Sequence, residues 1–337
     1  MATRERGTRE NSMKGRKGDG RKALGVILIG TVLACLVPLA ADMESSYFVY
    51  FLFLVFTYIA LAQGWNLVAG YTGQISLGQN AFIGVGAYVT AFLWRGNLGG
   101  YFDPLTIFLS GLGASVLAIL VGIPLLSKLR GDYFALGTLG LGEILRVVVL
   151  QNSSVTGGSS GINLPSGAYA GMAIYYYYGL GLALFATLVV YFITKSRVGL
   201  ALTAVRDDET AAAASGIYVL KYKVLAFAVG AFITGLCGNL QAYYLFHIDA
   251  PNVFGLNWTL YPILFCVLGA AGTLTGPIVG AFVLTAVFEI AKIWLPGIHP
   301  IVSGALIILV ILFVPNGFLR VRLRRMIGVE RGGSFKP

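Results

Sequence analysis

The amino-acid sequence predicts an all-α polytopic membrane protein with about ten transmembrane helices. Only 11% of its 337 residues are charged and 57% are hydrophobic, and the mean hydropathy is +0.80. A soluble domain has about 25% charged residues. The apolar residues also form continuous blocks, close to the roughly 20 residues that a helix needs to cross about 30 Å of hydrocarbon. These blocks lack the alternation of a membrane-spanning strand. Composition therefore favours membrane helices over a soluble domain or a barrel.

Ten apolar segments are predicted to span the membrane, at residues 23–41, 47–68, 75–94, 104–126, 133–150, 170–194, 223–246, 258–270, 274–292 and 300–315. They divide the chain into a basic arm at 1–22, which we expect to be disordered, a transmembrane domain at 23–316 and a basic tail at 317–337. The first segment is longer than the apolar region of a typical signal peptide, which favours a retained helix over a cleaved one. Retention makes the number of spans even, so both termini should lie on one side.

The basic residues indicate which side that is. Of the 24 lysines and arginines, 21 fall in residues 1–22, 128–130, 195–223 and 319–337, which share one side if the spans cross in succession. Such an excess marks the cytoplasmic side, so both termini and the loop 195–223 are predicted to be cytoplasmic. Membrane orientation thus accounts for the net charge of +10, and no folded basic domain remains that would bind nucleic acid.

No metal site or enzyme active site is predicted. Cys35, Cys237 and Cys266 lie inside apolar segments without a Cys-x-x-Cys pair, as small buried residues do. His247 and His299 have no cluster of metal-ligating residues around them in the sequence. The sequence also lacks a Gly-x-x-x-x-Gly-Lys-Ser/Thr phosphate loop. If ATP drives this protein, another chain must bind it.

Two glycine-rich passages replace polar loops between spans. Residues 70–76 and 269–275 superpose at an offset of 199, matching two glycines and a hydroxyl residue. Paired interruptions indicate an internal repeat and a substrate path, although glycines also let helices pack closely. Irregular backbone inside a membrane needs polar partners, which favours a cavity wall or gate near the centre of the molecule. The predicted path or gate residues are Gly70, Gly73, Gln74, Ser76, Gln79, Gly269, Gly272, Thr273 and Thr275.

The cytoplasmic loop 195–223 is predicted to contain two short helices. Residues 200–206 form an amphipathic piece, and the acidic residues 207–209 suit the start of a second helix over 210–215. Gly216 would end that helix. So much local order is unusual for a linker.

Several charged and aromatic residues lie inside or at the ends of spans. Glu143 and Arg146 share a helix face and are predicted either to pair structurally or to serve the substrate or a gate. Glu289 and Lys292 have the same spacing near the outer end of their span, where we expect them to snorkel to the interface. The four tyrosines at 175–178 are predicted to join an aromatic interfacial belt.

Five stretches resemble the permease subunits of branched-chain amino acid ABC importers, the LivM type. They lie at residues 69–88, 129–146, 156–162, 196–217 and 268–281, in the order of that family, and include Gly-Tyr-Thr-Gly-Gln-Ile-Ser-Leu-Gly-Gln at 70–79 and Leu-Gly-Ala-Ala-Gly-Thr-Leu-Thr-Gly-Pro at 268–277. The resemblance covers everything except the basic arm and the short tail.

The resemblance implies a type II ABC importer permease fold with two pseudo-symmetric halves, in a bacterial inner membrane. It implies four kinds of partner: a second permease subunit, expected to be a paralogue, two cytoplasmic ATPase subunits, a periplasmic or lipid-anchored substrate-binding protein, and membrane lipids. The ATPase subunits would use the ATP, and this chain would bind no cofactor. The loop 195–223 would be the coupling element that docks on an ATPase, through Arg197, Gly199, Arg206, Asp207, Asp208, Glu209 and Gly216. At Leu200 the sequence departs from the family, whose members often carry arginine there.

The predicted function is a transport subunit that forms part of the path for branched-chain or other hydrophobic amino acids. A urea or short-chain amide ABC permease is an alternative within the same class. An ion-coupled secondary transporter is a further alternative, in which Glu143 and Glu289 would be the coupling sites.

Overall fold

The computed structural model describes residues 46–165, 169 and 171–294, together with the isolated residues 25, 30, 34, 35 and 304. The predicted spans 23–41 and 300–315, the basic arm and the basic tail therefore lie outside the continuously described residues. Each of the other eight predicted spans contains a long helix. Among the described residues, seven helical segments are long and apolar enough to cross a membrane.

The long helices are α2 (Tyr47–Trp65), which continues into the π-helix η1 (Asn66–Gly70), α3 (Gln79–Arg95), α4 (Pro104–Lys128), α5 (Asp132–Gln151), α7 (Met172–Lys195), α10 (Val219–Leu245), α12 (Asn257–Gly269) and α13 (Gly276–Trp294). The short elements are α6 (Ser153–Thr156), η2 (Gly158–Ser160), β1 (Ile162–Asn163), α8 (Arg197–Asp207), α9 (Glu209–Ala214), β2 (His247–Ile248) and α11 (Ala250–Val253).

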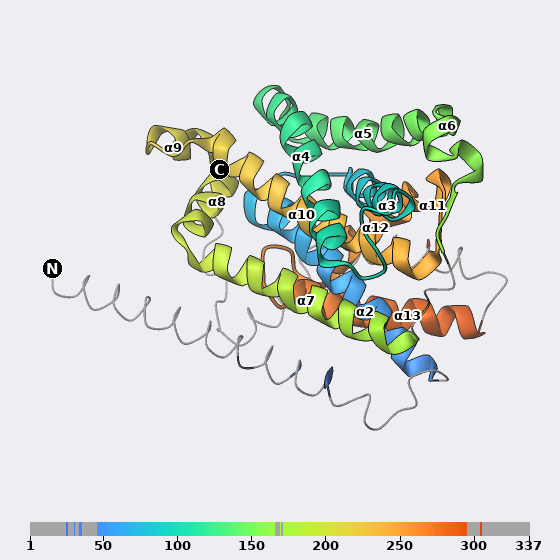
Figure 1. Ribbon diagram of the computed structural model, residues 1–337. Helices are drawn as coiled ribbons and strands as arrows, with labels where there is room; N and C mark the ends of the chain where they lie inside the picture. Colours follow the sequence, from blue (N-terminus) through green and yellow to red (C-terminus); the bar gives the residue numbers. More distant parts are fainter. Residues whose placement is uncertain are drawn as a thin grey trace, which may run out of the picture.

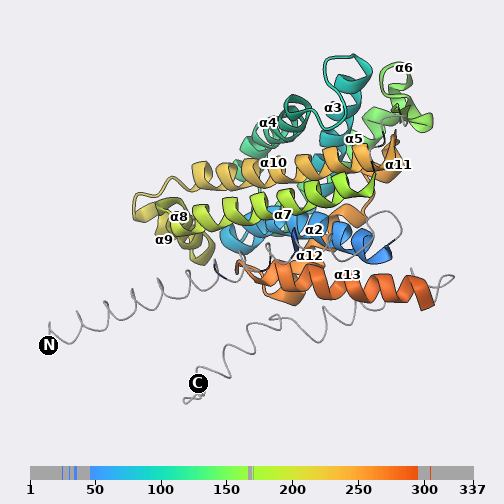
Figure 2. The same ribbon diagram turned by 60° about the horizontal axis from the view of Figure 1, so that its bottom comes forward.

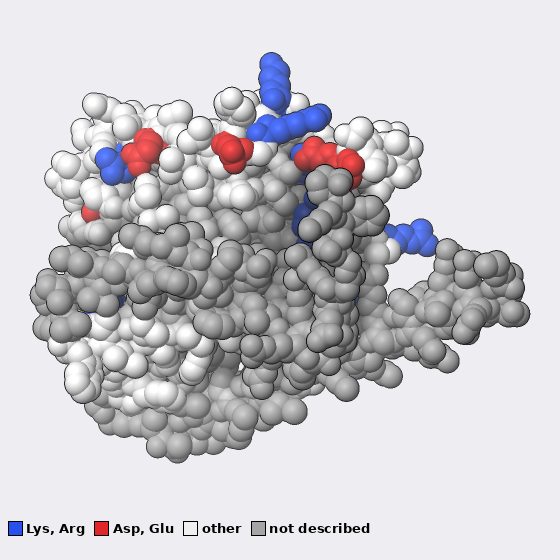
Figure 3. Space-filling view, turned by 180° about the vertical axis from the view of Figure 1, so that it is seen from behind, with Lys and Arg blue, Asp and Glu red and all other residues white. Residues whose placement is uncertain are grey.

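The long helices run side by side, and the short elements gather at their two ends. Figures 1 and 2 show α2, α7 and α10 in the middle of the described bundle, with α8 and α9 at one end and α6 and α11 at the other. On the face shown in Figure 3, most of the described charged side chains gather along the upper edge, with a few more below it. Long apolar helices with short elements at both ends suit a bundle that spans a bilayer.

Helix α2 lies at the centre of the bundle and helix α5 at its periphery, as the fraction of buried residues in each shows. In the most apolar window of Tyr47–Gly70, 72% of the residues are buried, against 22% in the window of α5. Helix α2 packs against α7, α10, α12 and α13, so its apolar face extends all round. Helix α5 packs mainly against α3 and exposes large apolar residues, among them Leu136, Ile144 and Val147.

Small residues bring α10 into close contact with α3 and α4. A β-carbon added at Gly86 of α3 would lie 2.1 Å from the carbonyl oxygen of Gly235, and one added at Gly238 would lie 2.2 Å from that of Ile83. On the α4 side, a β-carbon at Gly235 would lie 2.6 Å from Ala114 Cβ. Membrane helices associate through such backbone approach because lipid supplies no hydrophobic drive between them.

The end of the bundle opposite α8 is an ordered platform. Strand β1 pairs antiparallel with β2, with Ile162 opposite Ile248, and Thr156 Oγ1 donates to the carbonyl oxygen of Val149 at 2.6 Å. The turn of α6 and η2 is therefore fixed to both α5 and the segment that follows α10.

Two expectations for this end were wrong. Tyr175 and Tyr176 are fully buried, and Tyr175 donates to the carbonyl oxygen of Tyr243 at 2.9 Å. Only Tyr177 of the four tyrosines is largely exposed, because the other rings pack against α2 and α10 in the protein core. Glu289 is also buried and does not snorkel: it contacts Lys292 and accepts a hydrogen bond from Tyr47 of α2.

The close contact of α3 and α10 predicts that a larger side chain at this interface destabilises the protein, whereas the same change at an open position of α5 does not. Gly86→Leu should lower the free energy of unfolding by about 1–3 kcal/mol, as overpacking does, because its side chain would meet Gly235. Gly140→Leu in α5 is the control, since a β-carbon there meets nothing within 4 Å. Thermal unfolding of the purified protein in detergent measures both. Equal thermal midpoints for the two variants would contradict this packing.

Candidate functional site

The two glycine-rich passages lie against each other. A β-carbon added at Gly70 would lie 2.4 Å from the amide nitrogen of Gly272, so the two backbones touch. Gly73 and Gly272 occupy equivalent positions in the two passages and have φ of +73° and +77°, a conformation that side chains disfavour. The sequence comparison of residues 70–76 with 269–275 therefore identified segments that meet in space and share a positive φ at one equivalent position.

Side chains of α2 and η1 hold the second passage in place. Asn66 Nδ2 donates to the carbonyl oxygen of Thr273 at 2.9 Å, and the amide of Gly272 donates to Asn66 Oδ1 at 2.7 Å. One turn earlier, Gln63 Nε2 donates to the carbonyl oxygen of Leu274 at 2.8 Å. Asn66 begins the π-helical turn, a distortion frequent at functional sites. These two amides supply partners to backbone that has left helical geometry.

After Gly73 the chain runs without helix to Gly78 and then begins α3. Here Asn80 Nδ2 donates to the carbonyl oxygen of Phe254, and the Asn80 amide donates to Thr259 Oγ1. Thr259 lies in the first turn of α12. With only 13 residues, α12 is about 20 Å long, shorter than a bilayer core. The junction of α3 and α12 is therefore expected to lie at membrane depth.

The polar residues predicted to line a path are mostly buried at this junction. Ser76, Gln74 and Gln79 are buried, and Thr234 Oγ1 donates to Gln79 Oε1 at 2.9 Å. In the second passage, Gly269 is buried, whereas Thr273 and Thr275 are half-buried. Gly269 packs so closely on Gly276 that an added β-carbon would lie 1.8 Å from its carbonyl oxygen. Gly73, Ile75 and Ala271 are exposed, so the passages are closely packed where they touch each other and at Gly269, and accessible at these three residues.

The predicted helices of the loop 195–223 are confirmed as α8 and α9. Asp208 separates them and caps α9, accepting hydrogen bonds from the amides of Thr210 at 2.8 Å and Ala211 at 3.0 Å. Gly216 follows α9 with φ of +81°, the conformation expected of a residue that ends a helix. Gly199 packs against the end of α7, where a β-carbon would lie 2.5 Å from the carbonyl oxygen of Thr194.

The charged residues of this segment point in different directions. Arg197 and Asp207 are exposed, and Leu200, at the position where the resembled family often has arginine, is 58% exposed. Arg206 instead reaches the glycine passages: its Nη1 donates to the carbonyl oxygen of Gly70 at 3.1 Å. Glu209 contacts the buried Lys223 of α10 and accepts a hydrogen bond from Gln74 Nε2 at 3.0 Å.

Glu143 and Arg146 form the predicted pair within α5. Arg146 Nε lies 3.3 Å from Glu143 Oε2, and their side chains are 44% and 41% exposed for Glu143 and Arg146 respectively. The pair does not contact the glycine passages in any described interaction. Its exposure in the middle of a long apolar helix means that water, lipid or another protein must face it.

Sequence reasoning missed Gln63, Asn66 and Lys223 as members of this site. The first two are polar residues three apart in a strongly apolar span, directly before Gly70, so their helical spacing could have indicated a shared polar face. Lys223 was placed at the boundary of the loop. A lysine at the start of a span is ordinarily an interfacial residue, so the sequence contains no signal that this one is buried.

Comparison with known proteins identifies the family. The family described as "Branched-chain amino acid transport system / permease component" matches residues 47–312. The chain belongs to this family. It is therefore a multi-pass membrane protein of the transport permease class, and the matched region contains both glycine passages, the α8–α9 segment and α5.

Curated relatives of this permease agree. It is 29% identical over 311 residues to the high-affinity branched-chain amino acid transport system permease protein LivM of Escherichia coli, covering 83% of this chain and 72% of the relative. A LivM protein of Methanocaldococcus jannaschii is 25% identical, over 61% of this chain and 66% of the relative. The LivH permease of Salmonella typhimurium is also 25% identical, over 82% of this chain and 97% of the relative. No solved structure matches significantly.

The contact between the passages predicts that Gly272→Ala impairs transport. The new β-carbon would lie 2.7 Å from the carbonyl oxygen of Gly70, at a φ that itself costs about 1–3 kcal/mol for a residue other than glycine. Gly131→Ala is the control, because it has positive φ but no atom within 4 Å. Substrate uptake per amount of permease in the membrane should fall strongly for the first variant only. Similar uptake by both variants would show that backbone strain, not the contact, matters at Gly272.

Proposed function

We propose that this permease is one membrane subunit of an ATP-driven importer for branched-chain or other hydrophobic amino acids. Family membership supports a role in transport, and the names of its LivM and LivH relatives support the substrate class. The observation that carries the proposal is the attachment of α8–α9 to the first glycine passage. An ATPase outside the membrane can move the transmembrane helices only through a segment that it can reach. A short helical segment that lies outside the spans and contacts the interior of the bundle provides such a connection.

The proposed architecture has ten spans in two pseudo-symmetric halves within residues 23–316. The arm 1–22, the loop 195–223 and the tail 317–337 are cytoplasmic, which agrees with their basic residues. The shared backbone geometry of Gly73 and Gly272 supports two related halves. The protein would reside in a bacterial inner membrane, with α6, η2 and β1 facing the periplasm and presenting an ordered platform to a periplasmic or lipid-anchored substrate-binding protein.

The translocation path is proposed to pass the two glycine passages and the junction of α3 with α12. Its residues would be Gly70, Gly73, Gln74, Ser76, Gln79, Gly269, Gly272, Thr273 and Thr275. Because these residues are now mostly packed, transport requires that the passages separate. Glu143 and Arg146 are half-exposed on α5. The outer face of α5 is proposed to be covered by a second permease subunit, expected to be a paralogue, which this pair would contact.

The outward face of the α8–α9 segment is proposed to dock on a cytoplasmic ATPase. Arg197 and Leu200 of α8 and Ala211 and Ala214 of α9 are exposed there. An apolar leucine with alanines suits a groove in a partner better than it suits water. Two ATPase subunits would hold and hydrolyse the ATP, which agrees with the lack of a phosphate loop in this sequence. This chain itself would bind no cofactor.

Reconstitution tests this function. The permease is co-expressed with the proposed ATPase, second-permease and binding-protein partners. The complex is placed in proteoliposomes with labelled leucine and binding protein on the outer side. We expect leucine uptake only when ATP reaches the ATPase side, and no competition by urea or acetamide. Uptake driven by a proton or sodium gradient without ATP would contradict the proposal and favour an ion-coupled transporter. Competition by urea or acetamide would instead place the substrate among small amides.

A further inference from the structure

Lys223 is a cation sealed inside the protein. It lies in the second turn of α10, its side chain is 2% exposed, and its ammonium contacts the carboxylate of Glu209 in α9. A buried ammonium is strongly unfavourable unless an opposite charge faces it. The ion pair of Lys223 and Glu209 therefore holds the start of α10 against the start of α9, because separating it would leave a buried charge without a partner.

The same carboxylate also ties α9 to the first glycine passage. Glu209 Oε1 accepts a hydrogen bond from Gln74 Nε2 at 3.0 Å as well as contacting Lys223. Gln74 is buried, and its own Oε1 has no hydrogen-bond partner. The amide is thus oriented for Glu209 alone. One carboxylate joins α9, the start of α10 and the first glycine passage, where Gln74 lies 135 residues away in the sequence.

A second tie runs from α8 to the same passage. Arg206 Nη1 donates to the carbonyl oxygen of Gly70, and its Cγ would lie 3.0 Å from a β-carbon at Gly73. The same Nη1 would lie 2.9 Å from a β-carbon at Gly272. Arg206 therefore lies against both passages, while its guanidinium also pairs with the exposed Asp207 and part of the side chain stays accessible.

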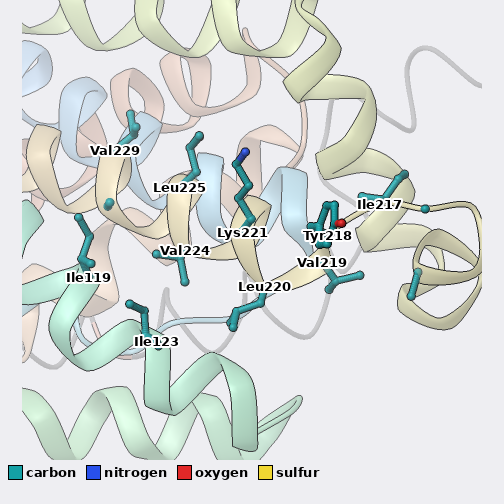
Figure 4. Close-up of a pocket in the computed structure, with 13 residues that line it drawn as sticks. Ile119, Ile123, Ile217, Tyr218, Val219, Leu220, Lys221, Val224, Leu225 and Val229 are labelled. Carbon is teal, nitrogen blue, oxygen red and sulfur yellow. The ribbon is translucent and has the colours of Figure 1, made fainter.

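On its other side the segment borders open space. Figure 4 shows an apolar groove of about 1060 Å³ between α4 and the start of α10, with Ile119 and Ile123 on one wall and Ile217 and Tyr218 at the end next to α9. No packed helix stabilises the segment there among the described residues. A force on α8–α9 is accordingly transmitted to the first glycine passage and to α10.

We propose that Gln74, Arg206, Glu209 and Lys223 are positioning residues that make α8–α9 and the first glycine passage move as one body. This inference rests on the proposed ATP-driven function and assigns a role within it. It gives Arg206 and Glu209 a role beyond the docking expected for them, because both contact the first glycine passage, at Gly70 and Gln74. Docking on the ATPase falls to the outward residues of the segment, Arg197 and Leu200 among them.

Charge variants of the reconstituted complex test the link. Glu209→Gln and Lys223→Met should each lower leucine uptake per ATP hydrolysed about tenfold, within the usual range of coupling between sites, while the ATPase subunits still co-purify. Lys221→Met is the control: it removes the same charge two residues away, from an exposed side chain, and should behave as wild type. The exchange Glu209→Lys with Lys223→Glu should restore coupling, because Gln74 can rotate its amide and offer its free Oε1 to the new ammonium.

Two results would overturn the inference. Wild-type uptake per ATP in both single variants would show that the pair transmits nothing. Loss of the ATPase subunits together with uptake would make Glu209 a docking residue. If the wild-type complex itself shows no ATP-dependent uptake, the proposed function fails instead, so the two failures can be told apart.

A cross-link tests the link even if the charge variants fail to fold. Cysteines replace the exposed Ile75 and Thr210, the chain neighbours of Gln74 and Glu209, in a background without native cysteines, which leaves all four positioning residues intact. Joined by a short bifunctional maleimide, this variant should transport as well as it does before cross-linking, or better, because the segments already move together. Loss of uptake on cross-linking would mean that they must separate, which contradicts the proposal.

Discussion

The backbone that leaves helical geometry within the bundle must find hydrogen-bond partners there, because a bilayer offers none. Asn66 meets much of this requirement: it accepts from the amide of Gly272 and donates to the carbonyl oxygen of Thr273. The two passages can approach only because Gly70 and Gly272 have no side chains. This contact fixes the ends of α2 and α12 and the start of α13 relative to one another, and the remaining helices pack around it.

The contact between the two passages is also a point at which a small force could separate two parts of the bundle. The passages are bound by a few amide hydrogen bonds and by Arg206, and no long interdigitated apolar surface joins them. Hydrogen bonds exchange partners at small net cost, whereas tightly packed apolar cores resist displacement. The two passages can therefore adopt two discrete conformations more readily than the packed α3–α10 interface can. They also contact α8 and α9, through Arg206 and Glu209.

Hydrophobicity and glycine placement allowed much of this structure to be predicted from the sequence. The long helices within eight of the predicted spans, the similarity of residues 70–76 to 269–275 and the cap at Gly216 depend on local composition, which the sequence displays directly. The contact of Arg206 with Gly70 and the burial of Tyr175 could not be predicted, because each depends on a residue more than 60 positions away. The burial of Lys223 depends on how α9 packs against the start of α10 and places Glu209 beside it. A charged residue in a basic loop looks like a surface residue until its tertiary partner is known.

The central claim is that the α8–α9 segment and the first glycine passage move together when ATP binds. Spin labels at Ala214 and Ile75, both exposed, report the distance between the segment and that passage. A third label at Ala271, exposed in the second passage, reports whether the two passages separate. Pulsed electron paramagnetic resonance on the reconstituted complex should show an unchanged 214–75 distance between nucleotide-free and ATP-bound states, and a changed 214–271 distance. A 214–75 distance that shifts while 214–271 stays constant would contradict the account.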